Sequence, residues 1–245
     1  MPPLRLLFDC FPDDPALDTA VSEATMRRVA AGELPETLRL ARPARVVAFA
    51  KRDALAPGYA QAVAAARAAG FGSVLRLAGG RAAVFHEGTL ELAHAVPSSD
   101  PRGGISARFE ATAELIARAL RRLGVDARVG EVPGEYCPGR WSVNAAAARK
   151  LAGIGQRVIS GGAHVGTVIV AEDALAVRGV LEPVYAALSL SWDPATVGAV
   201  AEEAPGVGWS AVHDAVLAEY GERYELVEDV LDAETLELAR GLAGR

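Results

Sequence analysis

The chain has 245 residues, a formal net charge of −6 and a pI near 5.3, and 51% of its residues are hydrophobic against 23% charged. This balance is typical of a globular protein and excludes global disorder. The acidic charge gives no sign of a nucleic-acid partner. The N-terminal apolar run is too short for a signal peptide, and no stretch approaches the roughly 20 apolar residues that cross a bilayer. We therefore expect a cytoplasmic protein without a membrane partner, whose two cysteines are thiols.

Short strands and helices alternate along the chain. Alternation over residues 4–10 predicts a first strand with Cys10 among apolar residues on one face, so Cys10 is expected to be buried against a sheet. A helix follows over 14–32, beginning at Asp14 and ending at Gly32. Further strands are expected over 37–41, 45–50, 73–77, 82–86, 90–96 and 161–171, and helices over 56–70, 106–124 and 172–188. From about residue 190 the pattern indicates helix, strand and helix.

These elements predict one α+β domain over 1–245, in which a mixed, largely antiparallel sheet is flanked by helices. Successive strands mostly read as hairpins. Gly-Gly pairs mark two expected hairpin turns, one between residues 77 and 82 and one at 161–162. The part from about 190 to 245 is expected to be a helix–strand–helix extension of the same domain.

Rare residue types gather in one stretch, GEYCPGRWSVNAAAARKLAGIGQR, at 134–157. The whole chain holds two Lys, two Gln, two Cys and one Asn, and one of each lies there: Cys137, Asn144, Lys150 and Gln156. Only two of the 25 Lys and Arg residues are Lys, so a bias toward Arg explains the scarcity but not the position of the exceptions. A lysine kept in such a chain is a candidate for a task that Arg cannot perform, because its ammonium is a compact charge with a tunable pKa.

Cys137 and Lys150 are the candidate reactive groups of this stretch. Cys137 lies between Gly134 and Gly139, a sequence typical of a loop, where functional residues concentrate. The alternative is an accidental surface or half-buried cysteine. Small residues at 152, 153 and 155 leave room for a ligand near Lys150, whereas the usual fate of a lone lysine is a solvated surface.

A second candidate region is RLAGGRAAVFH at 76–86. The N–H groups of its Gly-Gly turn, with Arg81 beside them, can bind an anion or a carbonyl, although Gly-Gly between strands is most often only a hairpin. His86 at a strand end and His164 near the Gly161 turn are candidate wall residues of a site. The four histidines lack metal-ligand spacing, so no metal site is predicted.

Three motifs together resemble those of the lipoate-protein ligase and octanoyltransferase family, whose enzymes share a catalytic fold with biotin protein ligases. The motifs are RLAGGRAAVFH, then KLAGIGQRV from Lys150, then GGAHVGTVIV from Gly161, and they follow in the family's order over residues 76–170. There are two departures from the family pattern. Leu75 stands where the family often has a second Arg, and an extra Ala lies between Arg81 and Val84.

The resemblance implies roles for particular residues. Cys137 lies in the loop where Cys-dependent octanoyltransferases carry their nucleophile, and Lys150 would contact the acyl carbonyl or an adenylate phosphate. The turn would close on the acyl chain, and the next two motifs would line the same pocket, an apolar tunnel with its polar groups at one end. The implied substrate-binding residues are Arg76, Gly79, Gly80, Arg81, His86, Gly153, Gln156, His164, Gly166 and Thr167.

The activity implied by the resemblance is acyl transfer in lipoate metabolism. The Cys137 thiolate would attack an octanoyl thioester on acyl carrier protein, and Lys150 would stabilise the oxyanion. The octanoyl (or lipoyl) group would then pass to a lysine of a lipoyl domain, in a 2-oxoacid dehydrogenase complex or in the glycine cleavage carrier protein. No cofactor is required in this mechanism.

Two alternatives stay open. An ATP-dependent lipoate-protein ligase would use ATP and Mg to form an acyl-adenylate beside Lys150, with Cys137 as a bystander. A catalytically inactive relative would only bind acyl groups or lipoyl domains. The transferase is favoured because Cys137 lies in the expected loop and because the chain ends at Arg245, without the further C-terminal domain that many single-chain ligases carry.

Overall fold

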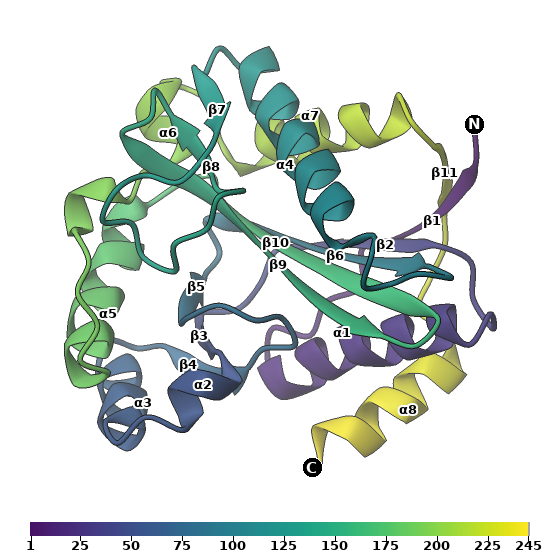
Figure 1. Ribbon diagram of the computed structural model, residues 1–245, viewed down its shortest axis with the longest axis horizontal. Helices are drawn as coiled ribbons and strands as arrows, with labels where there is room; N and C mark the ends of the chain where they lie inside the picture. Colours follow the sequence, from purple (N-terminus) through teal and green to yellow (C-terminus); the bar gives the residue numbers. More distant parts are fainter. Residues whose placement is uncertain (245) are drawn as a thin grey trace.

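The computed structural model describes residues 1–244 and forms two sheets with helices packed around them (Figure 1). The strands are β1 (Pro3–Leu7), β2 (Thr37–Ala41), β3 (Val46–Phe49), β4 (Gly72–Leu75), β5 (Ala83–Phe85), β6 (Thr89–Pro97), β7 (Ala127–Val129), β8 (Val143–Ala145), β9 (Arg149–Ile159), β10 (Gly162–Val170) and β11 (Glu225–Glu228). The helices are α1 (Pro15–Ala30), α2 (Lys51–Ala54), α3 (Tyr59–Ala68), α4 (Ile105–Arg122), α5 (Ala174–Ala187), a 3-10 turn (Pro194–Thr196), α6 (Val200–Glu203), α7 (Trp209–Gly221) and α8 (Ala233–Ala243).

The larger sheet has eight strands in the order β11-β1-β2-β6-β10-β9-β8-β7. Its first three strands run parallel, and every other neighbouring pair is antiparallel. The smaller sheet has the order β4-β3-β5. This arrangement confirms the predicted single α+β domain with a mixed, largely antiparallel sheet. The long β9–β10 hairpin crosses the middle of the molecule (Figure 1), and a turn at Ser160 and Gly161 closes it, one position before the predicted Gly-Gly turn at 161–162.

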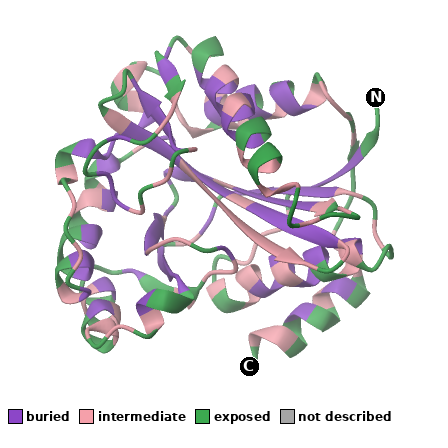
Figure 2. Ribbon diagram, in the orientation of Figure 1, coloured by how far each residue is buried: buried purple, intermediate pink, exposed green. Residues whose placement is uncertain are grey.

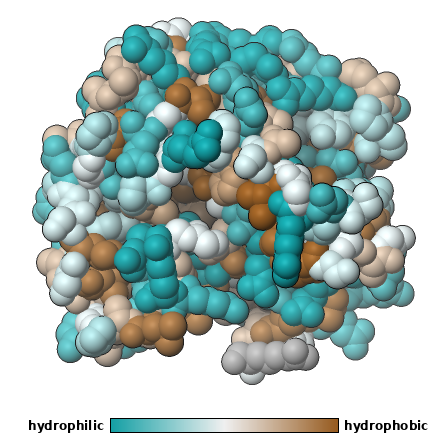
Figure 3. Space-filling view, viewed as in Figure 1, coloured by the Kyte–Doolittle hydropathy of each residue, from teal (hydrophilic) through white to brown (hydrophobic). Residues whose placement is uncertain are grey.

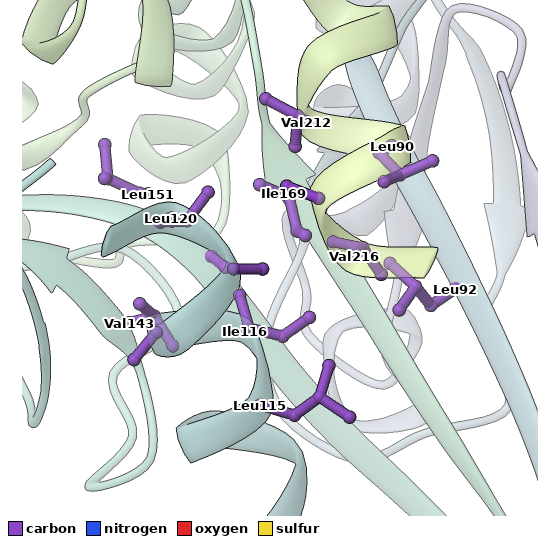
Figure 4. Packing of buried hydrophobic residues seen from close by; sticks show 14 of the residues in the cluster. Leu90, Leu92, Leu115, Ile116, Leu120, Val143, Leu151, Ile169, Val212 and Val216 are labelled. Carbon is purple, nitrogen blue, oxygen red and sulfur yellow. The ribbon is translucent and has the colours of Figure 1, made fainter. Parts of the chain in front are cut away.

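The main core lies on the face of the large sheet that α4 and α7 cover. Apolar residues recur at helical spacing in α4, so Leu115, Ile116 and Leu120 all point at the sheet and are buried. They pack with strand residues such as Leu92 and Ile169 (Figure 4). Helix α1 covers the opposite face, beside β6 and β10, and burial is concentrated between these layers (Figure 2).

The first strand is shorter than predicted. β1 ends at Leu7, Phe8 is 37% exposed, and Cys10 lies half-buried in the loop before α1. The prediction that Cys10 is buried against the sheet is therefore wrong. The reason is topological: β1 runs parallel to β2, a connection that requires a crossover, so the chain leaves the sheet early to form α1.

The Gly-Gly segment between residues 77 and 82 is not a hairpin turn. β4 and β5 do not pair with each other, because β4 pairs parallel with one edge of β3 and β5 pairs antiparallel with the other. The connecting segment, which we call the glycine loop (76–82), must cross from one edge to the other. Local turn chemistry cannot reveal that a third strand lies between the two. Within residues 1–244, no helix is long and apolar enough to span a bilayer.

Candidate active site

A cavity of about 560 Å³ opens between the large sheet, the start of α1, the glycine loop and the loop before β8. Figure 3 shows a hollow near the middle of the face, with apolar residues along its wall. Cys137 and Lys150 both line the cavity, together with Arg76, Gly79 and Gly80. The structure thus brings together the two candidate regions that lie about 60 positions apart in the sequence.

Cys137 has an unusual backbone and a polarised sulfur. Its φ is +42°, a left-handed conformation that is costly for a residue with a Cβ and that recurs at functional sites. Its Sγ accepts hydrogen bonds from the Arg81 backbone N–H at 3.2 Å and from the Arg76 guanidinium at 3.4 Å. Two donors on one sulfur favour the thiolate.

The positive charges around Cys137 lower the pKa of its thiol. Burial by itself raises the pKa of the thiol, but the positive charges of Arg76 and Lys150 and the Arg81 N–H outweigh burial, so the pKa lies below its ordinary value. A lower pKa increases the fraction of thiolate, the nucleophilic form, at neutral pH.

Lys150 is 1% exposed, and its ammonium is bound entirely by the protein in this structure. It donates to the Glu135 carboxylate at 3.1 Å and to the carbonyl oxygens of Tyr136 and Cys137 at 3.1 and 2.8 Å. These three bonds use all three donors of an ammonium. Lys150 thus holds the Cys137 loop in place through these three hydrogen bonds. Its predicted contact with an acyl carbonyl stays a prediction.

Glu135 organises this loop, although no sequence motif marks it. The carboxylate is 3% exposed and accepts four hydrogen bonds, from the Val132 and Gly139 N–H groups, the Ser142 hydroxyl and Lys150. A buried lysine requires a buried counter-charge. The acid two positions before Cys137 could have been found by that requirement, had the burial of Lys150 been predicted.

Tyr185, on α5, joins the Cys137 loop to the glycine loop and was also missed. Its hydroxyl accepts the Cys137 backbone N–H at 2.9 Å and donates to the Ala82 carbonyl at 3.0 Å. It is 2% exposed. No local pattern marks it, because it lies 48 positions from the cysteine that it holds.

The glycine loop covers the cysteine. A Cβ at Gly80 would lie 1.9 Å from the Arg76 guanidinium and 2.8 Å from the Cys137 sulfur, and the φ of Gly80 is +114°. Only glycine fits there. The Arg81 side chain turns away, toward the buried Asp53 at 3.1 Å. Arg81 does not line the cavity, and only its backbone N–H reaches the Cys137 sulfur.

Glycines form part of the cavity floor. Gly153, Gly155 and Gly166 share one face of the β9–β10 hairpin, since Gly155 pairs with Gly166 and Gly153 with Val168. A Cβ at Gly155 would meet the Cβ of Ala78 at 2.7 Å, so the glycine loop crosses directly over this strand. His164 lies on the same face and lines the cavity.

Two expected pocket residues direct their side chains elsewhere. Gln156 binds the Ile105 carbonyl and Arg108 at 2.9 Å each, so its amide ties β9 to the start of α4. Thr167 is paired with Leu92 and Ile154, which places it on the sheet face covered by α4 and α7. Both residues border the cavity, but neither side chain is on the face that carries His164.

His86 was expected to form part of the site wall, but it is not among the residues that line the cavity. It is 1% exposed, and its Nδ1 accepts the Gly88 N–H at 3.0 Å. Burial lowers the pKa of the ring. The strand before it ends at Phe85, so His86 begins the turn to β6, and its ring packs inside that turn instead of facing the cavity.

Comparison with known proteins places these features in a family. A family model described as the lipoyl protein ligase A/B catalytic domain matches residues 14–220. An octanoyl-[GcvH]:protein N-octanoyltransferase of Geobacillus kaustophilus is 30% identical over 146 residues, which cover 60% of this chain and 51% of that protein. A lipoyl-[GcvH]:protein N-lipoyltransferase of Listeria monocytogenes is 28% identical over 156 residues, covering 62% and 56%. The chain spans about half the length of the curated relatives it matches.

Solved structures of lower identity share the fold. A T. acidophilum protein with bound lipoic acid has a TM-score of 0.78 at 23% identity, over 99% of this chain and 95% of that chain. Lipoate-protein ligase A bound with ATP has a TM-score of 0.78 at 21% identity, over 100% and 95%. The match of the family model covers most of the chain, including the Cys137 loop, the glycine loop and the β9–β10 hairpin. The chain therefore belongs to the lipoyl protein ligase A/B catalytic domain family.

Proposed function

We propose that this protein is an acyltransferase of protein lipoylation that moves an octanoyl or lipoyl group through a thioester on Cys137. The observation that carries the proposal is the Cys137 thiol, which lines the cavity, accepts hydrogen bonds from Arg76 and the Arg81 N–H, and has a lowered pKa. A thiolate facing a cavity is the requirement for covalent acyl transfer. The names of the relatives, which are octanoyl and lipoyl transferases, support the same reaction class.

The proposed donor is an acylated carrier of the GcvH type. It replaces the acyl carrier protein expected from the sequence, because the relatives are named for transfer from [GcvH]. The proposed acceptor is a lysine of a lipoyl domain. If the donor also holds its acyl group on a lysine, one amide is broken and another is formed, so the net reaction is close to isoenergetic and no ATP is needed.

The first step forms the acyl-enzyme. The Cys137 thiolate attacks the acyl carbonyl carbon, the carbon–sulfur bond forms, and the bond to the carrier nitrogen breaks. The leaving amine takes a proton from solvent. As the sulfur gives up its charge, the Arg81 N–H and the Arg76 guanidinium, which bound the thiolate, can bind the developing oxyanion.

The second step reverses these events with another amine. The neutral acceptor lysine attacks the thioester carbon, the carbon–sulfur bond breaks, and Cys137 leaves as a thiolate while the new amide loses one proton. The same two donors bind the oxyanion again. Lys150 and Glu135 contribute by holding the Cys137 loop in place.

Intact mass spectrometry tests the proposal. A small octanoyl thioester is used to form the acyl-enzyme, because a thioester donor lets the adduct accumulate where an amide donor does not. We expect the mass of one octanoyl group to be added without ATP, to be lost in Cys137→Ser and to be kept in Cys10→Ser, the matched control at the only other cysteine. Transfer from octanoyl-GcvH to a lipoyl domain should show the same pattern.

The two alternatives predict different outcomes. A lipoate-protein ligase would modify the lipoyl domain only with ATP and Mg, and Cys137→Ser would remain active. An inactive relative would bind octanoate but would neither form the adduct nor modify the lipoyl domain under either condition.

A further inference from the structure

One peptide unit of the glycine loop is held from both sides. The peptide bond between Gly80 and Arg81 presents its N–H to the Cys137 sulfur at 3.2 Å, and its carbonyl oxygen accepts a hydrogen bond from the Arg52 guanidinium of α2. In a trans peptide the N–H and the C=O point in opposite directions. α2 and the Cys137 loop therefore bind this unit from opposite sides.

The chain itself does not fix the orientation of this peptide unit. Gly80 has no Cβ and a φ of +114°, and glycine adopts positive and negative φ about equally readily. Type I and type II turns differ by rotation of one such peptide plane, which leaves the flanking chain in place. The same rotation between Gly80 and Arg81 would remove the N–H from the Cys137 sulfur and direct the carbonyl oxygen toward it. Because a carbonyl oxygen repels a thiolate, the rotated unit would oppose ionisation of Cys137.

Arg52 disfavours the rotated orientation. Its charged guanidinium binds the Gly80 carbonyl oxygen on the side away from Cys137, and rotation of the peptide plane would break this hydrogen bond. A charged donor on the carbonyl oxygen also polarises the peptide, which strengthens its N–H as a donor to the sulfur. The single contact of Arg52 with the glycine loop therefore acts on both the direction and the strength of the hydrogen bond to Cys137.

A buried carboxylate holds the Arg81 side chain on the same side as Arg52. Asp53 is 0% exposed; one of its oxygens accepts the Ala50 N–H at 3.0 Å, and the other accepts a hydrogen bond from the Arg81 guanidinium at 3.1 Å. The Arg81 side chain is thus tied to α2 while its backbone N–H faces Cys137. Arg52 and Asp53 are consecutive residues of α2, which begins two positions after β3, the central strand of the small sheet. Both contacts therefore start from the same short segment of the chain.

We propose that Arg52 is a positioning residue of the acyl-transfer site: it holds the Gly80–Arg81 peptide in the orientation that directs the Arg81 N–H at Cys137, and Asp53 supports it by holding the Arg81 side chain. The inference rests on the proposed function, in which the Arg81 N–H binds first the thiolate and then the oxyanion. Arg52 is exposed and does not line the cavity, so it acts through this peptide.

The pH dependence of alkylation by iodoacetamide tests the proposal without an acyl substrate. The measurements use a Cys10→Ser background, so that only Cys137 reacts. Arg52→Ala should raise the midpoint by roughly half a pH unit to one unit, the order expected when a hydrogen bond to a charged group is weakened. The charges that act most strongly on the sulfur, Arg76 and Lys150, stay in place in this variant.

Two matched variants separate the contact from the charge. Lys51→Ala removes an equal charge from the neighbouring exposed position and should keep the wild-type midpoint. Arg52→Lys retains a charged donor and should recover most of the shift caused by Arg52→Ala. Arg52→Gln, which keeps a polar side chain without the charge, should lie between Arg52→Lys and Arg52→Ala, so the result does not depend on one substitution.

The Arg81 amide gives a readout that a merely structural role of Arg52 would not change. In isotope-labelled wild-type protein, the NMR resonance of this amide proton should move downfield as Cys137 ionises, because a hydrogen bond to a thiolate is stronger than one to a thiol. In Cys137→Ser this titration should vanish. Arg52→Ala should lose roughly half or more of the titration shift, whereas Lys51→Ala should keep it.

Two results would overturn the proposal. One is an equal change of the alkylation midpoint in Arg52→Ala and Lys51→Ala, and the other is an unchanged titration of the Arg81 amide in Arg52→Ala. The absence of an octanoyl adduct on Cys137 of the wild type would instead contradict the acyltransferase function. Alkylation and the amide titration would still decide the role of Arg52, since neither measurement uses an acyl group.

Discussion

At the scale of single residues, two adjacent glycines offer a matched test of the glycine loop. Gly80→Ala would place a Cβ against the Arg76 guanidinium and the Cys137 sulfur in a backbone conformation unfavourable to alanine, whereas a Cβ at Gly79 meets nothing within 4 Å. We expect Gly80→Ala to slow alkylation of Cys137 by iodoacetamide and acyl-enzyme formation by at least about tenfold, a barrier increase of about 1.4 kcal/mol. Gly79→Ala should behave like the wild type. Equal alkylation rates in Gly80→Ala and Gly79→Ala would contradict the close packing of Gly80 against Arg76 and Cys137.

Arg76→Gln tests the cause of the lowered thiol pKa. Burial favours the neutral thiol, and Arg76 is the foremost of the groups that oppose burial, so removing its charge should raise the pKa of Cys137. The midpoint of the alkylation rate against pH should move upward, and the rate at pH 7 should fall. Arg27→Gln, at an exposed position near the end of α1, is the control. An unchanged midpoint in Arg76→Gln would remove Arg76 from this role.

Sequence pattern identified the residues that are chemically unusual and missed those that support them. Cys137 and Lys150 are conspicuous because their types are rare in this chain. Glu135 and Tyr185 belong to common types, and their importance lies in hydrogen bonds to backbone groups at positions 132, 137, 139 and 82. Such partners become visible only when the loop has a conformation. The same is true of Lys150: no sequence pattern predicts that its ammonium binds the backbone of the Cys137 loop.

At the scale of elements, Tyr185 connects α5 to both loops of the site. Tyr185→Phe removes the one hydroxyl that binds the Cys137 N–H and the Ala82 carbonyl, leaving both groups without that partner. We expect a loss of about 1–3 kcal/mol in the free energy of unfolding and slower acylation, because Cys137 loses one restraint on its left-handed backbone. Denaturant unfolding and adduct formation measure the two effects.

The control for this variant is Tyr59→Phe on α3. The Tyr59 ring packs edge-on against Phe49, and its hydroxyl forms no hydrogen bond within residues 1–244. Stability and acylation rate should change little. An equal loss of unfolding free energy in the two variants would show that the two hydrogen bonds of the Tyr185 hydroxyl do not stabilise the protein.

The elements that were predicted well are those whose pattern is local. Apolar spacing predicts α4, and the Gly-Gly pair predicts the β9–β10 turn to within one residue. The errors arise where pairing joins distant segments. β1 is short because its partners β2 and β11 are both parallel, and the glycine loop is no hairpin because β3 lies between the strands that it joins. Neither fact can be read from the residues of the segment itself.

At the scale of the whole molecule, the two ends of the chain complete the large sheet together. β1 pairs with β11, and α8 packs along α1 (Figure 1). β1, β11 and α8 all lie outside residues 14–220, the part matched by the family model. Ala239 of α8 lies in one apolar cluster with Ala20, Val21 and Ala24 of α1. The cavity is lined by other positions of α1, namely Pro15, Asp18, Thr19 and Ser22. We call β1, β11 and α8 the closing unit; it packs on α1, and none of its residues lines the cavity.

Asp232 is the central contact of this closing unit. It caps α8 by accepting the Thr235 N–H at 2.9 Å, and it binds the guanidinium groups of Arg28 on α1 and Arg5 on β1. Asp232→Ala removes the cap and leaves two largely buried arginines with fewer partners. We expect a loss of about 2 kcal/mol or more in the free energy of unfolding, a cap alone being worth about 1 kcal/mol. Acylation of Cys137 in the folded protein should be unchanged, since none of these residues lines the cavity.

The effect of Asp232 should depend on pH in a defined direction. Burial alone would raise its pKa, but the Thr235 and Arg28 contacts outweigh burial and lower the pKa to about 2, beneath the value of about 3.9 in an unfolded chain. A lowered folded pKa gives stability that is present above pH 4 and is lost as the pH falls toward 2. The difference in melting temperature between wild type and Asp232→Ala should therefore shrink over this window. Asp13→Ala, at an exposed position, should have the melting temperature of the wild type at every pH. If the difference in melting temperature between wild type and Asp232→Ala stayed constant down to pH 2, the charge of Asp232 would not stabilise the closing unit.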